Sequence, residues 1–162
     1  MGQVIWRSVY QLIFKIIRII IIMLNKIYLE FSDIYKCAEY VILSSPPISF
    51  KVDQRSPDLD QLMLRYGVST AGFITACNPH GIQQSDELNE LAMNQLKLAI
   101  EELGLPYFSG FGKGPVGEWH EDSYLVVGMD SDFASKLGRF YQQNALVMLI
   151  NGQAPELVWL SE

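Results

Sequence analysis

The stretch "SPDLDQLMLRYGVSTAGFITA", residues 56–76, carries the clearest structural pattern in this chain. Its first part predicts a helix, because Ser56 suits the N-cap, Pro57 suits the first helical position and Gly67 suits the residue just past the end. Its second part, "STAGFITA" at 69–76, is a short apolar run that predicts a buried strand. A helix followed at once by a buried strand indicates a domain in which helices cover a sheet.

The same kinds of pattern continue on both sides. The remaining expected strands are apolar runs bounded by turn residues, at 37–43, 48–52, 105–109, 123–129, 145–150 and 156–160. Further helices are expected over 85–103, which ends at Gly104, and over 131–143. The sequence therefore predicts a single α/β or α+β domain over residues 31–162, with a mixed sheet of about six or seven strands and about three helices.

Two finer details can be predicted. The apolar residues of the helix at 85–103 recur at intervals of three and four and should face the sheet; they are Leu88, Leu91, Ala92, Leu96, Ala99, Ile100 and Leu103. Asn151 and Gly152, between the last two strands, are typical of a tight hairpin turn in which both residues take positive φ angles.

The first 30 residues form a basic amphipathic pattern. On a helical wheel the polar residues fall within an arc of about 140°; they are Gln3, Arg7, Ser8, Gln11, Lys15, Arg18, Asn25 and Lys26. A spanning helix needs about 20 mostly apolar residues, so Lys15 and Arg18 make insertion marginal. Three interpretations stay open: a helix in which residues 1–26 contact an anionic membrane surface, a helix docked on the acidic body or a partner, and a start-site artefact in which Met23 begins the chain.

Charge and cysteine content narrow the function classes. The formal net charge is −6, and the part from Ile27 to Glu162 holds eight basic residues and all 18 acidic ones. Phosphate backbones repel so acidic a surface, so nucleic acid is excluded as a partner. Cys37 and Cys77 are too few for a disulfide framework, which favours a cytoplasmic location.

Two familiar motifs are present in incomplete form. The segment "GKGPVGEWHED", residues 112–122, fits the spacing G-x-G-x-x-G, but a strand pattern follows it where a phosphate site needs a helix N-terminus. Zinc-binding residue types occur at Cys77, His80, His120, Glu121 and Asp122, without a standard ligand spacing. We therefore predict a connection without phosphate, no metal and no cofactor.

The loop "TACNPHG", residues 75–81, leaves a buried strand and leads to a helix. Ligands bind at such places in open α/β sheets, although Asn78 and Pro79 equally suit a simple turn.

Four features occur in this order along the chain: "FITACNPHG", Asn89, "GEWHEDSYLVVGM" and "LGRFYQQNALV". Together they resemble the bacterial domain-of-unknown-function 3293 family, and the resemblance covers about residues 35–160. The family pattern falls on Thr75, Ala76, Asn78, Pro79, Asn89, Trp119, Glu121, Gly138, Gln143, Asn144 and Ala145. His80 and His120 depart from the family pattern, which is a further argument against a metal site. The resemblance implies no activity.

Three hypotheses follow for function. The first is a domain that binds a small polar ligand or a protein partner through side chains that share the family pattern, namely Thr75, Asn78, Asn89, Trp119, Glu121, Gln143 and Asn144. The second is an enzyme in which Glu121 is the general acid or base, its pKa raised by desolvation beside Trp119. The third is a membrane-surface protein that uses the N-terminal helix.

Overall fold

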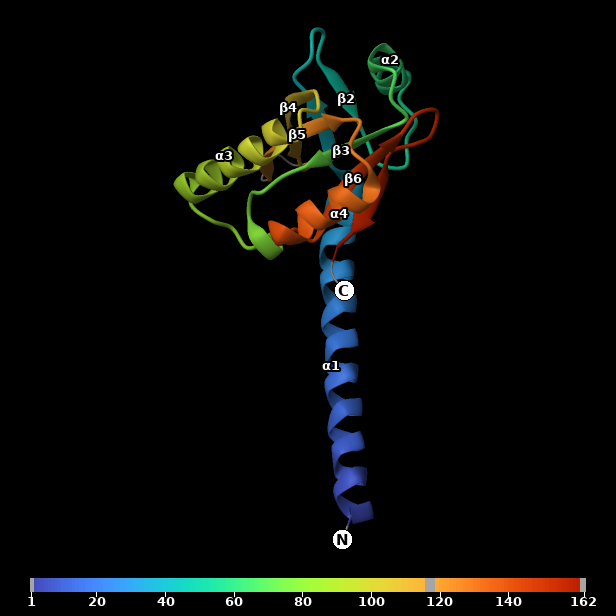
Figure 1. The fold of residues 1–162 in the computed structure, drawn as a ribbon, viewed down its shortest axis with the longest axis vertical. Coiled ribbons are helices and arrows are strands. Elements are labelled where there is room, and N and C mark those ends of the chain that lie inside the picture. The colour runs from blue at the N-terminus through green and yellow to red at the C-terminus, as the bar shows by residue number, and fades with distance from the viewer. Residues whose placement is uncertain (1, 116–118, 161–162) are drawn as a thin grey trace. The chain divides into compact units, whose positions relative to one another are not determined.

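The computed structural model describes residues 2–115 and 119–160, except for the side chains of residues 2–8, 10 and 23–30 (Figure 1). The chain divides into two compact units, Met1–Asp33 and Ile34–Ser161. Helix α1, Gly2–Cys37, makes up the described part of the first unit and continues into the start of the second. It is longer than the expected N-terminal helix, and it takes in Cys37, which we had assigned to a strand.

The second unit is built on a seven-stranded sheet in the order β2-β1-β4-β5-β3-β6-β7. The strands are β1 Glu39–Ile42, β2 Ile48–Phe50, β3 Thr70–Ile74, β4 Tyr107–Lys113, β5 His120–Val127, β6 Ala145–Ile150 and β7 Glu156–Trp159. The helices of this unit are α2 Pro57–Tyr66, α3 Asp86–Glu102 and α4 Ser131–Phe140, with a short 3-10 turn η1 at Pro79–Gly81. The predicted α+β class is confirmed.

All neighbouring strands in the described sheet are antiparallel, so the expectation of a mixed sheet was wrong. Helix α3 joins β3 to β4 and helix α4 joins β5 to β6, each by a crossover between strands that run in the same direction. Each crossover skips one position in the sheet, which an antiparallel strand fills. The central β3-α3-β4-β5-α4-β6 unit is thus a split βαβ arrangement of the ferredoxin-like kind.

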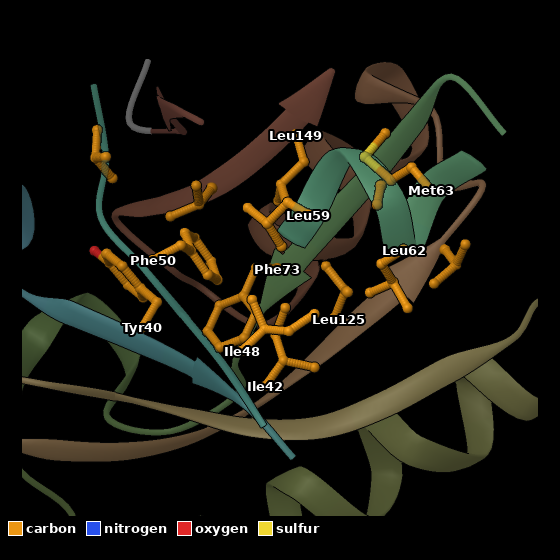
Figure 2. Packing of buried hydrophobic residues seen from close by; sticks show 14 of the residues in the cluster. Tyr40, Ile42, Ile48, Phe50, Leu59, Leu62, Met63, Phe73, Leu125 and Leu149 are labelled. Atoms are coloured by element: carbon orange, nitrogen blue, oxygen red, sulfur yellow. The ribbon is translucent and has the colours of Figure 1, made fainter. Parts of the chain in front are cut away.

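The sheet has two buried faces. Helices α3 and α4 cover one face, where Met93, Leu96 and Ala134 pack against Ile74 and Val126. The opposite face carries an aromatic and aliphatic cluster that α2 covers in part. Figure 2 shows the contributions from α2 and the sheet to this cluster, including Tyr40, Phe50, Leu59, Leu62, Met63, Phe73 and Leu125.

The predicted boundaries of α2 are confirmed. The helix begins at Pro57 and ends before Gly67, whose φ of 65° is the left-handed conformation that glycine adopts without strain. Ser56 is the N-cap residue but makes no side-chain capping hydrogen bond. At α3, the Ser85 hydroxyl does accept a hydrogen bond, from the Leu88 amide at 3.4 Å.

The buried face of α3 differs from the expected one. Its buried residues are Met93, Leu96 and Ile100, whereas Leu88 and Leu91 are 53% and 57% exposed. Met93 sulfur accepts a hydrogen bond from the Ala76 amide at 3.3 Å, so the Met93 side of the helix faces the loop after β3. The expected face of α3 came from the spacing of its apolar residues, which carries no information about this hydrogen bond.

The final hairpin pairs β6 with β7 as predicted. Its connection is not the tight two-residue turn that we expected, because it runs over residues 151–155. Only Gly152 takes a positive φ, of 80°, and the Gln153 amide donates to the Ile150 carbonyl at 2.9 Å. This is the pattern of a type II turn, in which only the second central residue needs a positive φ.

Among the described residues, no helix combines the length and the apolar character that crossing a membrane requires.

Candidate functional site

The glycine-rich segment is part of the sheet for half of its length. Strand β4 continues to Lys113, so Gly110 and Gly112 lie within a strand that we expected to end at residue 109. A Cβ atom on Gly112 would lie 2.8 Å from Trp119 Cη2 and 3.4 Å from Tyr40 Cδ1. This glycine therefore makes room for aromatic rings. The last glycine of the motif, Gly117, lies outside the described residues.

The loop that follows β3 has an unusual backbone. Asn78 and His80 take positive φ angles of 48° and 57°, and Gly81 follows at 71°. The left-handed region is uncommon for residues other than glycine, although asparagine and histidine tolerate it better than most. Side-chain contacts of Asn78 offset this strain.

Asn78 joins three segments of the chain. Its backbone amide donates to Asn89 Oδ1 at 2.9 Å, and Asn89 Nδ2 donates back to Asn78 Oδ1 at 3.0 Å. The same Oδ1 accepts the Gln84 amide at 2.9 Å. Asn78 Nδ2 donates to Glu121 Oε1 at 2.7 Å, which connects the loop and α3 to strand β5. Both polar atoms of the Asn78 side chain are therefore hydrogen-bonded within the protein.

Thr75 and Gln143 also hold this loop. The Thr75 hydroxyl donates to the Asp122 carbonyl at 2.7 Å and accepts the Cys77 amide at 3.0 Å. Gln143 Nε2 donates to the Cys77 carbonyl at 2.9 Å and to the Tyr141 carbonyl at 3.2 Å. The structure thus brings the polar residues of the family pattern to one end of the sheet, and several of them bind one another.

Glu121 has a different environment from these amides. Hydrophobic surroundings raise the pKa of its carboxyl above the usual range, and hydrogen bonds from Asn78 and Trp119 oppose that shift only in part, as does the nearby His120. Removing a carboxylate from water is energetically unfavourable unless it has partners. Perturbed carboxyl groups of this kind occur more often at functional sites than elsewhere.

A small cavity of about 40 Å³ lies beside Glu121. It is on the sheet face opposite α3 and α4, and Tyr35, Tyr40, Phe73 and Trp119 are among its walls. Thr75 and Gln143 also line it. Its volume is enough for about three water molecules, so it suits one small chemical group rather than a whole nucleotide cofactor.

Asn144 is buried, with 4% of its surface exposed. In the sequence it stands between Gln143 and Ala145, which line the cavity. Burial raises the pKa of the neighbouring Tyr35 hydroxyl to about 12, and a contact with the Asn144 side chain opposes this rise in part. Asn144 Nδ2 makes no hydrogen bond of normal geometry with the residues that the structure describes. A buried donor without a partner is destabilising and is uncommon in native proteins.

Two of the residues considered for a metal contact each other, His120 and Asp122, with 3.4 Å between Nε2 and Oδ1. Within the described chain no group of three or more histidine, cysteine or acidic side chains is arranged to hold a metal ion. His120 stacks on Phe111 at 4.7 Å, and Cys77 is buried with its pKa raised by desolvation to about 11. A separate groove of about 560 Å³ runs between α3 and strands β4 and β5, and His120, Asp122 and Asn89 line it.

The family model described as "Protein of unknown function (DUF3293)" matches residues 74–146. This segment of the chain belongs to the DUF3293 family. The match is shorter than the expected residues 35–160, but it contains every position that the family pattern assigned. No curated protein and no solved structure matches the chain.

The DUF3293 segment contains the hydrogen-bonded polar residues around the cavity, and residues outside this segment form part of the cavity wall. Tyr35 comes from the last turn of α1 and Tyr40 from β1, and both precede residue 74. Neither residue belongs to a motif that the sequence shows. No motif joins them to Trp119, and only the antiparallel pairing of β1 with β4 brings Tyr40 opposite Gly112.

Proposed function

We propose that this protein binds a small polar ligand in the cavity beside Trp119 and Glu121. The observation that supports this most strongly is the Glu121 carboxyl group itself. One oxygen of this carboxyl, Oε1, accepts a hydrogen bond from Asn78 at 2.7 Å, and the group lines a cavity whose other walls are largely aromatic and aliphatic. A ligand that hydrogen-bonds to Glu121 would offset its loss of water.

Replacing Glu121 by glutamine is expected to weaken ligand binding by about 10-fold or more, because a hydrogen bond to a charged group is lost. Small amines, carboxylates, amides and alcohols can be titrated into the full-length chain while the Trp119 indole signal is followed by NMR. The matched control is Glu39→Gln, since Glu39 is a half-exposed carboxylate on β1 that pairs with Lys113 at 2.9 Å. If no compound class shifts the Trp119 signal in the wild-type protein, the proposal is wrong.

A catalytic role for Glu121 is a second candidate at the same site. The raised pKa of its carboxyl favours this role, because a general acid or base works best when its pKa is near the working pH. Glu121→Gln would then abolish turnover of an identified substrate and leave the fold intact. Turnover that survives in this variant would contradict the assignment.

A role at a membrane surface is a separate candidate for α1. All described residues from Gln11 to Ile22 are exposed, including Phe14 at 76% and Leu12 at 60%. Lys15 and Arg18 lie on the polar side of this stretch, as in helices that rest on anionic lipid.

For this candidate we expect the full-length chain to sediment with anionic vesicles and not with zwitterionic ones. Reversing both charges, with Lys15→Glu and Arg18→Glu, should weaken that binding strongly, since each basic residue near the surface contributes about 1 kcal/mol. Co-sedimentation measures both effects. A wild-type chain that stays in solution with anionic vesicles would refute this role.

A further inference from the structure

The cavity beside Glu121 has an unusual wall for a polar site. Four aromatic side chains, Tyr35, Tyr40, Phe73 and Trp119, line it, and we call them the aromatic box. Glu121 is the one acidic side chain among its lining residues. Aromatic faces carry partial negative charge, so the aromatic box and the carboxylate both favour a positively charged group.

The rings of the box are tilted against one another. Tyr40 and Phe73 have centroids 5.6 Å apart and an interplanar angle of 77°, and Figure 2 shows them as neighbours in the core. Tyr35 and Trp119 are 6.1 Å apart and inclined at 48°. The cavity lies among these rings, and Tyr40 also stacks on Phe50 at 5.4 Å and 22°. Gly112 contributes to the cavity, because any side chain there would meet Trp119 and Tyr40.

The electrostatics select between possible ligand groups. An anionic group would meet Glu121 without a basic residue in the wall, and the acidic surface of the domain would repel it. A neutral alkyl group would fit the rings but would add no polar contact to those that Asn78 and Trp119 already make with the carboxylate. An ammonium group satisfies both, since it makes cation–π contacts with the rings and a charge-assisted hydrogen bond or ion pair with the carboxylate.

We propose that the cavity binds the ammonium group of an organic amine, either primary or methylated, with the aromatic box around the cation and Glu121 as its counter-ion. This inference rests on the proposed ligand-binding function of the same cavity and specifies its chemical class.

The affinity should depend on pH through Glu121. Burial raises the pKa of its carboxyl, and a bound cation favours the ionised form, so binding strengthens as the pH rises through that pKa. The titratable groups that also surround this carboxyl come from α1, β1, the loop after β3 and β5; they are Tyr35, Tyr40, Cys77, His120 and Asp122. In Glu121→Gln the pH dependence should disappear, which separates Glu121 from His120.

The test compares probes of equal shape and different charge on the full-length chain. Choline and tetramethylammonium are the cationic probes, 3,3-dimethylbutan-1-ol is the neutral isostere of choline, and acetate is the anionic probe. We expect choline to bind about 10-fold more tightly than its neutral isostere, as desolvated cation–π and charged contacts provide. Glu121→Gln should remove this preference, while Glu39→Gln should keep it. A capped lysine amide distinguishes a protein side chain from a free amine as the source of the cation.

Three results would be decisive. A clear preference for the cations that Glu121→Gln removes supports the proposal. If the neutral isostere or acetate binds as well as choline at the Trp119 signal, the ammonium inference is overturned and the ligand-binding proposal stands. If no probe of any charge binds there, both are overturned.

Discussion

Replacing Gly110 by alanine should destabilise the domain by about 3 kcal/mol or more, or prevent it from folding. A Cβ atom at this position would overlap the Val41 carbonyl oxygen of the neighbouring strand and lie 3.0 Å from Phe73 Cε2. The first of these is a backbone atom in the middle of the sheet, so neither partner can move without loss of β1–β4 pairing. Urea unfolding followed by tryptophan fluorescence measures the effect.

Gly114→Ala is the matched control, because it changes a second glycine of the same segment. Its Cβ would meet nothing closer than Trp119 Cβ at 3.5 Å, which is an ordinary contact, and we expect a change within about 0.5 kcal/mol. Equal losses in the two variants would contradict the explanation. A large effect at Gly110 alone would show that this glycine serves strand packing.

Local signals in the sequence predicted the elements well. Pro57 and Gly67 fix the ends of α2 through their own backbone preferences, which need no information from the rest of the chain. The apolar run of β6 and the following Gly152 likewise predict a hairpin from neighbouring residues. Each of these features depends on interactions over a few positions.

The order of the strands and the far wall of the site depend on distant residues. In the sheet, β4 lies beyond β5 and not beside β3. Either position would leave the apolar pattern of β3 and β4 unchanged, so the sequence could not exclude a mixed sheet. Tyr35 reaches Trp119 across 84 positions of the chain, without a shared motif. The polar frame was easier to anticipate, because the residues from Thr75 to Asn144 fall within one family segment.

Asn78→Ala is the other substitution from which we expect a large effect, about 3 to 5 kcal/mol. It removes the acceptor for the Gln84 amide and for Asn89 Nδ2, and it removes the donor to Glu121. Alanine also tolerates the φ of 48° poorly. Asn78→Gly separates the two causes, since glycine adopts this conformation freely. We expect it to be about 1 kcal/mol or more less destabilised than the alanine variant, by urea unfolding.

Asn78→Asp tests the contact with Glu121 by itself, because aspartate keeps the shape and the Oδ1 acceptor. Its second oxygen would replace the Nδ2 that now lies 2.7 Å from Glu121 Oε1, so two carboxylates would share the site. Like charges raise the pKa of one carboxyl in the folded state. The folded protein then binds a proton that the unfolded chain releases, and stability falls as the pH rises above the usual carboxyl pKa of about 4. We therefore expect Asn78→Asp to approach wild-type stability in acid and to lose it towards neutral pH. A constant deficit across this range would mean that Asn78 does not control the charge of Glu121.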